Sequence, residues 1–129
     1  MDIRCKTVCR AALIVGLAGA AGPALAHHSF AMFNQQQETT LSGVIEKFDW
    51  TNPHTFVWLD VSNGQAHERW GIEGMSPNYL SRRGWSKTTL GAGDKVTLTF
   101  HPLKDGQKGG SFVKVVLPSG KEMSMLGQG

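Results

Sequence analysis

The sequence predicts an all-β domain, a small OB-like five-stranded barrel with one short helix between the third and fourth strands. Three observations carry this prediction. Segments in which apolar and polar residues alternate recur along the body of the chain. The pair Asn63-Gly64 separates two of these segments, as in a hairpin, and one short helical pattern follows the third. An open meander sheet or a small sandwich is the alternative architecture.

The first three strands are expected at 40–50, 54–62 and 65–73. The first contains Gly43, and glycine permits the sharp bend that a strand shared by both halves of a barrel requires. The second and third should form an antiparallel hairpin, with Asn63-Gly64 as the two residues of a type I′ turn. The second strand places four residues on one side: Thr55, Val57, Leu59 and Val61.

The helix and the last two strands follow. Pro77, behind the N-cap Ser76, opens the helix, and Gly84 ends it. Strands are expected at 95–101 and 111–117, and a polar tail after the turn that closes the last strand. Residues 27–129 therefore form one domain in this prediction, because about 100 residues make one hydrophobic core.

Residues 1–26 have the three parts of a signal peptide. A basic start is followed by an apolar stretch at 11–22 and by Ala24-Leu25-Ala26, an A-x-A cleavage site. The apolar stretch is shorter than the roughly 20 residues that a membrane-spanning helix needs. We therefore expect export to the periplasm without stable membrane insertion. The other interpretation is a short buried helix of an intracellular protein.

Loss of this leader would change the charge of the chain. The chain has 13 basic and 10 acidic residues. Three of the basic residues and one of the acidic residues lie in the leader, so 10 basic and 9 acidic residues remain after its removal. A nearly neutral protein lacks the basic surface with which proteins bind nucleic acid, so no nucleic-acid partner is expected. Cys5 and Cys9 would leave with the leader, so no disulfide is expected. No protein partner can be predicted from the sequence.

Several motifs occur in a fixed order along residues 27–121. They are HHSFAMF at 27–33, WTNPHT at 50–55, W-x-I-E-G at 70–74, S-P-N-x-L-x-R-R-G-W at 76–85 and G-D at 93–94. Together these motifs resemble DUF6152, a family of small exported bacterial proteins of unknown function. The resemblance implies export and a single β-rich domain. It implies no activity, cofactor or partner, so function must be predicted from the residues themselves.

His27 and His28 follow the predicted cleavage site directly. Cleavage after Ala26 would give His27 a free α-amine, and this amine and its imidazole can chelate one metal. A further imidazole would complete the three-nitrogen set of a histidine brace, which suits copper(II). Cleavage after Ala24 would leave Leu-Ala-His, which also binds copper(II). Alternatively, both histidines are solvated parts of a flexible terminus, although the large apolar residues that follow them require burial.

The third ligand could come from three other histidines. His54 follows Asn52-Pro53 at the start of the second strand, and His101 ends the fourth strand. The alternatives are a His54 ring bonded to turn backbone and an exposed His101 ring. His67, near the hairpin turn, ranks last. Three methionines could serve copper(I) or could be core or tail residues: Met75, Met123 and Met125.

The competing functional prediction uses aromatic residues. Trp50, Phe56 and Trp58 could line a groove for a planar or sugar-like ligand, or they could form a second layer of core. Catalysis is not expected, because the acidic residues are scattered and no nucleophile with a base is evident. The sequence thus predicts a soluble periplasmic binding protein, for copper, or alternatively a metal-free module that binds a small molecule or a protein.

Overall fold

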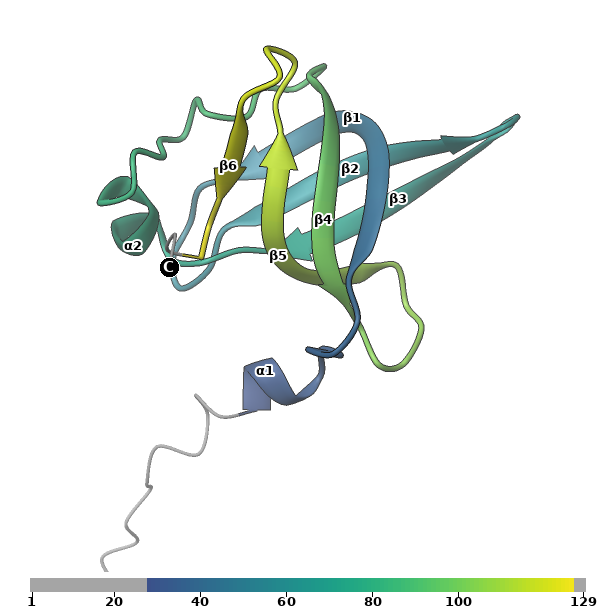
Figure 1. Cartoon of the computed structure of the whole chain (residues 1–129), viewed down its shortest axis with the longest axis horizontal. Coiled ribbons are helices and arrows are strands. Elements are labelled where there is room, and N and C mark those ends of the chain that lie inside the picture. The colour runs from purple at the N-terminus through teal and green to yellow at the C-terminus, as the bar shows by residue number, and fades with distance from the viewer. Residues whose placement is uncertain (1–27, 127–129) are drawn as a thin grey trace, which may run out of the picture.

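The computed structural model describes residues 28–126, which form six strands and two short helices (Figure 1). The predicted leader, residues 1–26, lies outside the described residues, as does His27. The elements in chain order are α1 (His28–Ala31), β1 (Thr39–Asp49), β2 (Phe56–Asn63), β3 (Ala66–Glu73), α2 (Pro77–Ser81), β4 (Lys95–Pro102), β5 (Gly109–Val116) and β6 (Glu122–Ser124).

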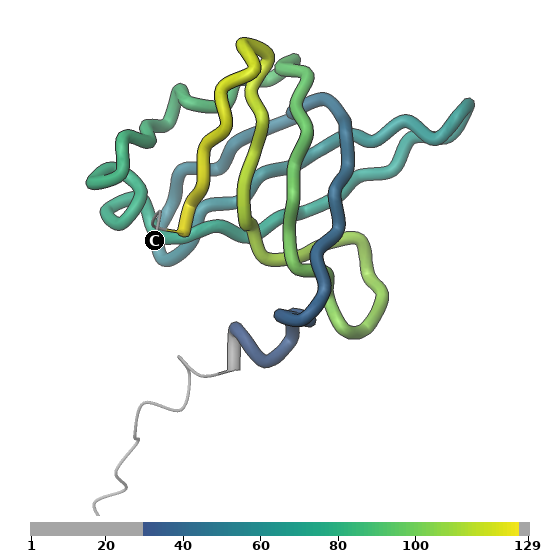
Figure 2. The backbone as a smooth tube through the Cα atoms, viewed as in Figure 1, coloured from purple at the N-terminus to yellow at the C-terminus, as the bar shows by residue number. Residues whose placement is uncertain are grey.

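Strands β1 to β5 form a closed barrel, and the backbone trace in Figure 2 shows how they wrap around one interior. Antiparallel pairing joins β3 to β2, β2 to β1, β1 to β4 and β4 to β5. Parallel pairing of residues 71–73 of β3 with residues 109–111 of β5 closes the ring. The predicted all-β fold, a five-stranded barrel with a short helix between the third and fourth strands, is therefore confirmed.

Strand β1 serves both halves of the barrel because it bends at Gly43. Its first part pairs with β4 as far as Val44, and from Val44 onward it pairs with β2. At the bend the backbones come so close that a Cβ on Gly43 would collide with the carbonyl oxygen of Asp60. The expectation that glycine permits this bend is confirmed.

The hydrophobic core lies inside the barrel and consists of inward-facing residues from each strand from β1 to β5. In β2, Val57 and Leu59 are fully buried, whereas Phe56 and Trp58, which alternate with them, are only partly buried. Helix α2 begins at the predicted Pro77, and the hydroxyl of its N-cap, Ser76, accepts a hydrogen bond from the backbone of Tyr79. The helix inserts Leu80 into the core and thereby covers one end of the barrel.

The predicted type I′ turn is wrong by one residue. Asn63 pairs with Ala66, so the two loop residues are Gly64 and Gln65. A type I′ turn needs a positive φ at both central positions, whereas only Gly64, at +66°, has one. Glycine at the first loop position is the pattern of a type II′ turn, so β2 ends one residue later and β3 begins one residue later than the Asn-Gly signal suggests.

The predicted polar tail is also wrong, because residues 122–124 form β6 on the free edge of β5. Met125, directly after β6, has an exposed fraction of 0% and belongs to the core. The indole of Trp85 donates a hydrogen bond to the carbonyl of Ser124 at 3.1 Å. One buried apolar residue after a three-residue strand is a weaker signal than an alternating strand, so the sequence does not predict β6.

Helices α1 and α2 have four and five residues. Over the described part of the chain, no helix has the length and apolar character required to cross a bilayer.

The bend at Gly43 yields a stability prediction. Gly43→Ala should lower the free energy of unfolding by about 1–3 kcal/mol, because the added Cβ forces two paired backbones apart. Gly91→Ala is the matched control, since its nearest new contact would be an ordinary 3.6 Å to Asp94, and it should change stability by less than about 0.5 kcal/mol. Urea denaturation measures both. Equal stability of the two variants would contradict the account of the bend.

The role of the C-terminal segment yields a second prediction. Met125→Ala should cost about 2–5 kcal/mol in the free energy of unfolding, because it empties a fully buried site. Met32→Ala provides the comparison, since Met32 is 48% exposed, and it should cost less than about 0.5 kcal/mol. Thermal or urea unfolding would show the difference, and a Met125→Ala protein as stable as the parent would mean that the segment is dispensable.

Candidate functional site

His54 and His101 line the same small cavity at one end of the barrel. Its volume is about 50 Å³, and its other walls include Glu73, Met75 and the aromatic rings of the N-terminal segment. We call it the histidine cavity; its lining residues are Phe30, Phe33, Gln35, His54, Glu73, Gly74, Met75, His101, Ser111, Phe112 and Leu126. The structure thus brings together two of the predicted copper ligands that are 47 positions apart in the chain.

The closure of the barrel explains why these residues meet. Ser111 of β5 pairs with Glu73 of β3 on one side and with His101 of β4 on the other. Neighbouring residues in paired strands point to the same face, so the three side chains form one row across the sheet. His54, just before β2, joins this row through its contact with Glu73.

His54 is held in place by its neighbour Thr55 and by a contact of its own ring. The next residue, Thr55, is fully buried, and its hydroxyl donates a hydrogen bond to the carbonyl of Met75 at 2.9 Å. The Nδ1 atom of His54 lies 2.5 Å from a carboxylate oxygen of Glu73. The expected alternative, a ring bonded to turn backbone, is therefore not what the structure has: the ring is bonded to an acidic side chain.

His101 is oriented in a similar way by a backbone group. Its Nδ1 lies 2.8 Å from the carbonyl oxygen of Gln37. A carbonyl oxygen only accepts, so Nδ1 carries the proton and donates it, and in the neutral ring Nε2 keeps the lone pair. The Glu73 carboxylate imposes the same proton position on His54. Among the side-chain hydrogen bonds that the structure describes for residues 30–126, neither Nε2 has a partner.

The N-terminal segment is fixed beside the cavity. Phe33 is 4% exposed and forms a β-bridge with Leu103. On either side of this bridge, Asn34 donates its backbone hydrogen bond to Pro102 at 2.8 Å, and Lys104 donates to Met32 at 2.9 Å. The expected burial of the apolar residues after the histidine pair is therefore confirmed for Phe33 only, since Phe30 and Met32 are about half exposed.

Two predicted ligands are not placed in full by the structure. His27 lies outside the described residues, and His28 is described only as the first residue of α1. Among residues 30–126, whose side chains the structure describes, no three side chains of the types His, Cys, Asp and Glu are grouped so that they could hold a metal ion. The described lining of the histidine cavity thus contains two imidazoles, those of His54 and His101, and one carboxylate, that of Glu73, which is paired with His54.

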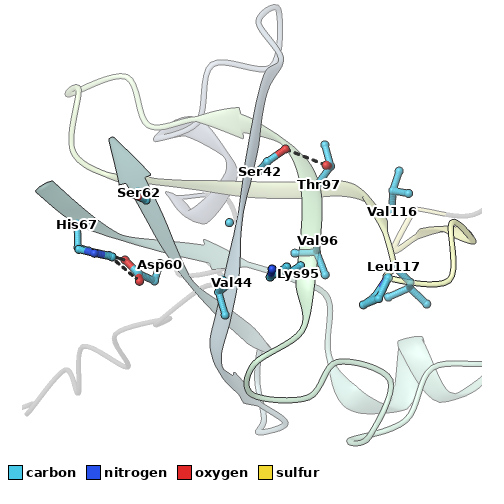
Figure 3. Close-up of a pocket in the computed structure, with 12 residues that line it drawn as sticks. Ser42, Val44, Asp60, Ser62, His67, Lys95, Val96, Thr97, Val116 and Leu117 are labelled. Carbon is cyan, nitrogen blue, oxygen red and sulfur yellow. Dashed lines mark hydrogen bonds and ion pairs between the residues drawn. The ribbon is translucent and has the colours of Figure 1, made fainter. Parts of the chain in front are cut away.

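A larger groove of about 640 Å³ lies elsewhere on the barrel, as Figure 3 shows. His67 and Asp60 form one wall, with the ring Nδ1 2.9 Å from the carboxylate, and Lys95 and Leu117 contribute to the opposite side. Of the three histidines whose side chains the structure describes, only His67 lies here, so the structure separates it from His54 and His101. The sequence did not predict this groove, because its lining residues come from five strands that meet beside the bend of β1.

The three predicted aromatic residues do not form one face. Trp50 packs against the core and against Phe48, with ring centroids 5.5 Å apart. Phe56 and Trp58, on the outer side of β2, stack on each other at 5.9 Å. The guanidinium of Arg69 lies 4.3 Å from the ring centroid of Trp58. The chain itself therefore occupies part of this aromatic surface.

The indole of Trp58 also donates a hydrogen bond to Asp49 at 2.8 Å. The ammonium of Lys47 and this indole together lower the pKa of the Asp49 carboxyl, because both favour the charged carboxylate. The stabilisation from this lowered pKa is present above the ordinary carboxyl pKa and is lost as the pH falls through the lowered one.

This arrangement predicts the titration of Asp49. Trp58→Phe should raise the pKa of Asp49, because one hydrogen bond to the carboxylate is lost, and Lys47→Met should raise it further. Titration of the side-chain carboxyl carbon by NMR measures the pKa. Phe56→Leu, which leaves both partners in place, is the control and should not change it. An unchanged Asp49 pKa in both test variants would show that these contacts do not form in solution.

Residues 13–112 match the model of a family of unknown function, DUF6152. The match begins inside the predicted leader, includes all of the motifs from HHSFAMF to G-D, and ends within β5. Comparisons with curated proteins and with solved structures found no match. Because the family model covers more than half of the sequence and the predicted landmarks occur in order, the chain belongs to the DUF6152 family.

Proposed function

We propose that this chain is an exported periplasmic protein that binds copper(II) at its mature N-terminus. In this proposal the signal peptide is cleaved after Ala26, and His27 and His28 supply the first ligands. An imidazole of His54 or His101 completes the site. The observation that carries the proposal is that His54, just before β2, and His101 of β4 line one cavity, which the segment following His27 and His28 helps to form.

The N-terminal ligands are within reach of this cavity. Phe30 lines it and lies only three residues after His27. Three residues of fully extended chain span at most about 11 Å. Phe33 and its backbone hydrogen bonds fix the segment six residues after His27, and six residues of extended chain span at most about 22 Å. Processing would thus place a primary amine close to two oriented imidazoles.

The orientation of the two rings is the one that metal-binding histidines adopt. Such a histidine donates its other ring N–H to a carboxylate or a backbone carbonyl, which fixes the tautomer and aims the free nitrogen. His54 has a carboxylate in this role and His101 a carbonyl. Nitrogen donors of this kind favour copper(II) over the other divalent ions of the first transition row.

The alternative function is binding of a small molecule without a metal. The groove in Figure 3 favours it, since its volume of about 640 Å³ lies within the usual range of about 300–1,000 Å³ for ligand sites. The predicted aromatic face supports this alternative less well, because Trp50 lies apart and Arg69 lies over Trp58. A protein that fails the copper test below would leave this groove as the site to study.

The proposal is tested with processed, untagged protein. Intact mass should show that the secreted form begins at His27, and electron paramagnetic resonance should detect one tightly bound copper(II) with nitrogen ligands. A form with an extra methionine before His27 should bind copper(II) at least tenfold more weakly, because the chelating amine is displaced. The double variant His54→Ala, His101→Ala should also lose at least tenfold, because the folded site loses its imidazoles.

His67→Ala is the matched control, since His67 pairs with Asp60 at the distant groove and should not affect copper(II) affinity. A synthetic peptide HHSFAMF supplies the second reference. If it binds copper(II) as tightly as the protein, or if the double variant behaves like His67→Ala, the folded copper site does not exist. A secreted form that begins elsewhere than His27 overturns the proposed ligand set.

A further inference from the structure

We infer that the histidine cavity is by itself a copper(I) site, formed by the Nε2 atoms of His54 and His101 and the thioether of Met75. The inference rests on the proposed function for the choice of copper as the metal. It differs in its ligands, since it uses no group of the N-terminal histidines. All three donors belong to residues that line the cavity.

Met75 is held next to His54 by its backbone. Its carbonyl accepts two hydrogen bonds from Thr55, one from the backbone N–H at 3.2 Å and one from the hydroxyl at 2.9 Å. The returning hydrogen bond from Gly74 to the carbonyl of Thr55, at 2.8 Å, completes a short ladder. This ladder, whose Thr55 is fully buried, pairs Met75 with the residue that follows His54, and both His54 and Met75 line the cavity.

The cavity is small. A single water molecule needs about 10–15 Å³ of such space, so a volume of about 50 Å³ holds one metal ion with at most a few waters. Four apolar side chains line the cavity, and two of them, Phe33 and Phe112, are buried. A site with so little space takes most of its donors from the protein, and a low coordination number, which copper(I) tolerates, is favoured.

The donor types and the cost of burying charge both favour copper(I) over copper(II). A soft thioether selects copper(I), and imidazole binds it as well. The idealised cost of desolvating an ion grows with the square of its charge, so copper(I) pays about a quarter of the cost of copper(II). Glu73 is the one acidic side chain that lines the cavity, and it contacts His54, so it can balance a single positive charge.

The other methionines of the described chain do not meet these conditions. Met32 is about half exposed and Met125 is fully buried in the core, whereas Met123, like Met75, packs against the core. None of the three lines the histidine cavity. Met75 is therefore the thioether that the structure assigns to the site.

The experiment measures copper(I) affinity by competition with bicinchoninate, under anaerobic conditions with ascorbate as reductant. Two parent forms are compared, the mature protein that begins at His27 and the form with an extra N-terminal methionine. Both should bind one copper(I) with affinities that agree within threefold. Met75→Leu should lower the copper(I) affinity at least tenfold in both forms, while the copper(II) spectrum of the mature form stays unchanged. X-ray absorption should detect a sulfur ligand that Met75→Leu removes.

Met123→Leu is the matched control and should leave copper(I) affinity unchanged, and circular dichroism checks that each variant is folded. Loss of copper(I) binding in the form with the extra methionine, or an unchanged affinity in Met75→Leu, would overturn the inference while leaving the copper(II) proposal intact. Conversely, copper(I) binding that depends on Met75 in a protein that binds no copper(II) would support the inference and refute the N-terminal site.

Discussion

The candidate site depends on one feature of the fold, the parallel pairing of β3 with β5 that closes the barrel. Through this pairing Ser111 lies between Glu73 and His101, and the row of three side chains spans β3, β5 and β4. His54 reaches the row from the start of β2 through its contact with Glu73. Without closure, the two imidazoles would lie on opposite parts of an open sheet, and the cavity between them would not exist.

A second constraint gives the cavity its cover. The N-terminal segment lies beside residues 102–104, with Phe33 inserted and a backbone hydrogen bond on either side. The segment therefore lies next to the residues that follow His101, although about 70 positions of sequence separate it from His101. The same contacts therefore bring Phe33 to the wall of the histidine cavity and set the side from which a processed terminus would approach. The large groove of Figure 3 has more space, but the smaller cavity concentrates the donor atoms that bind metals.

The sequence predicted the barrel, the bend at Gly43 and the start of the helix at Pro77, because alternation, glycine and capping residues are local signals. It placed the hairpin turn one residue too early and missed β6, since register and short polar edge strands depend on partners elsewhere in the chain. It named His54 and His101 separately, but only the register of three strands places them at one cavity. The orientation of the rings by Glu73 and by the carbonyl of Gln37 left no pattern in the sequence.

The central claim is that His54 and His101 present their Nε2 atoms to one metal ion. Long-range proton–nitrogen correlation NMR of the imidazole rings, before and after one equivalent of copper(I), tests it most directly. The account predicts that both rings carry their proton on Nδ1 and that the Nε2 signals of both shift together, while those of His67 do not. Rings protonated on Nε2, or a shift confined to one of the two histidines, would contradict it.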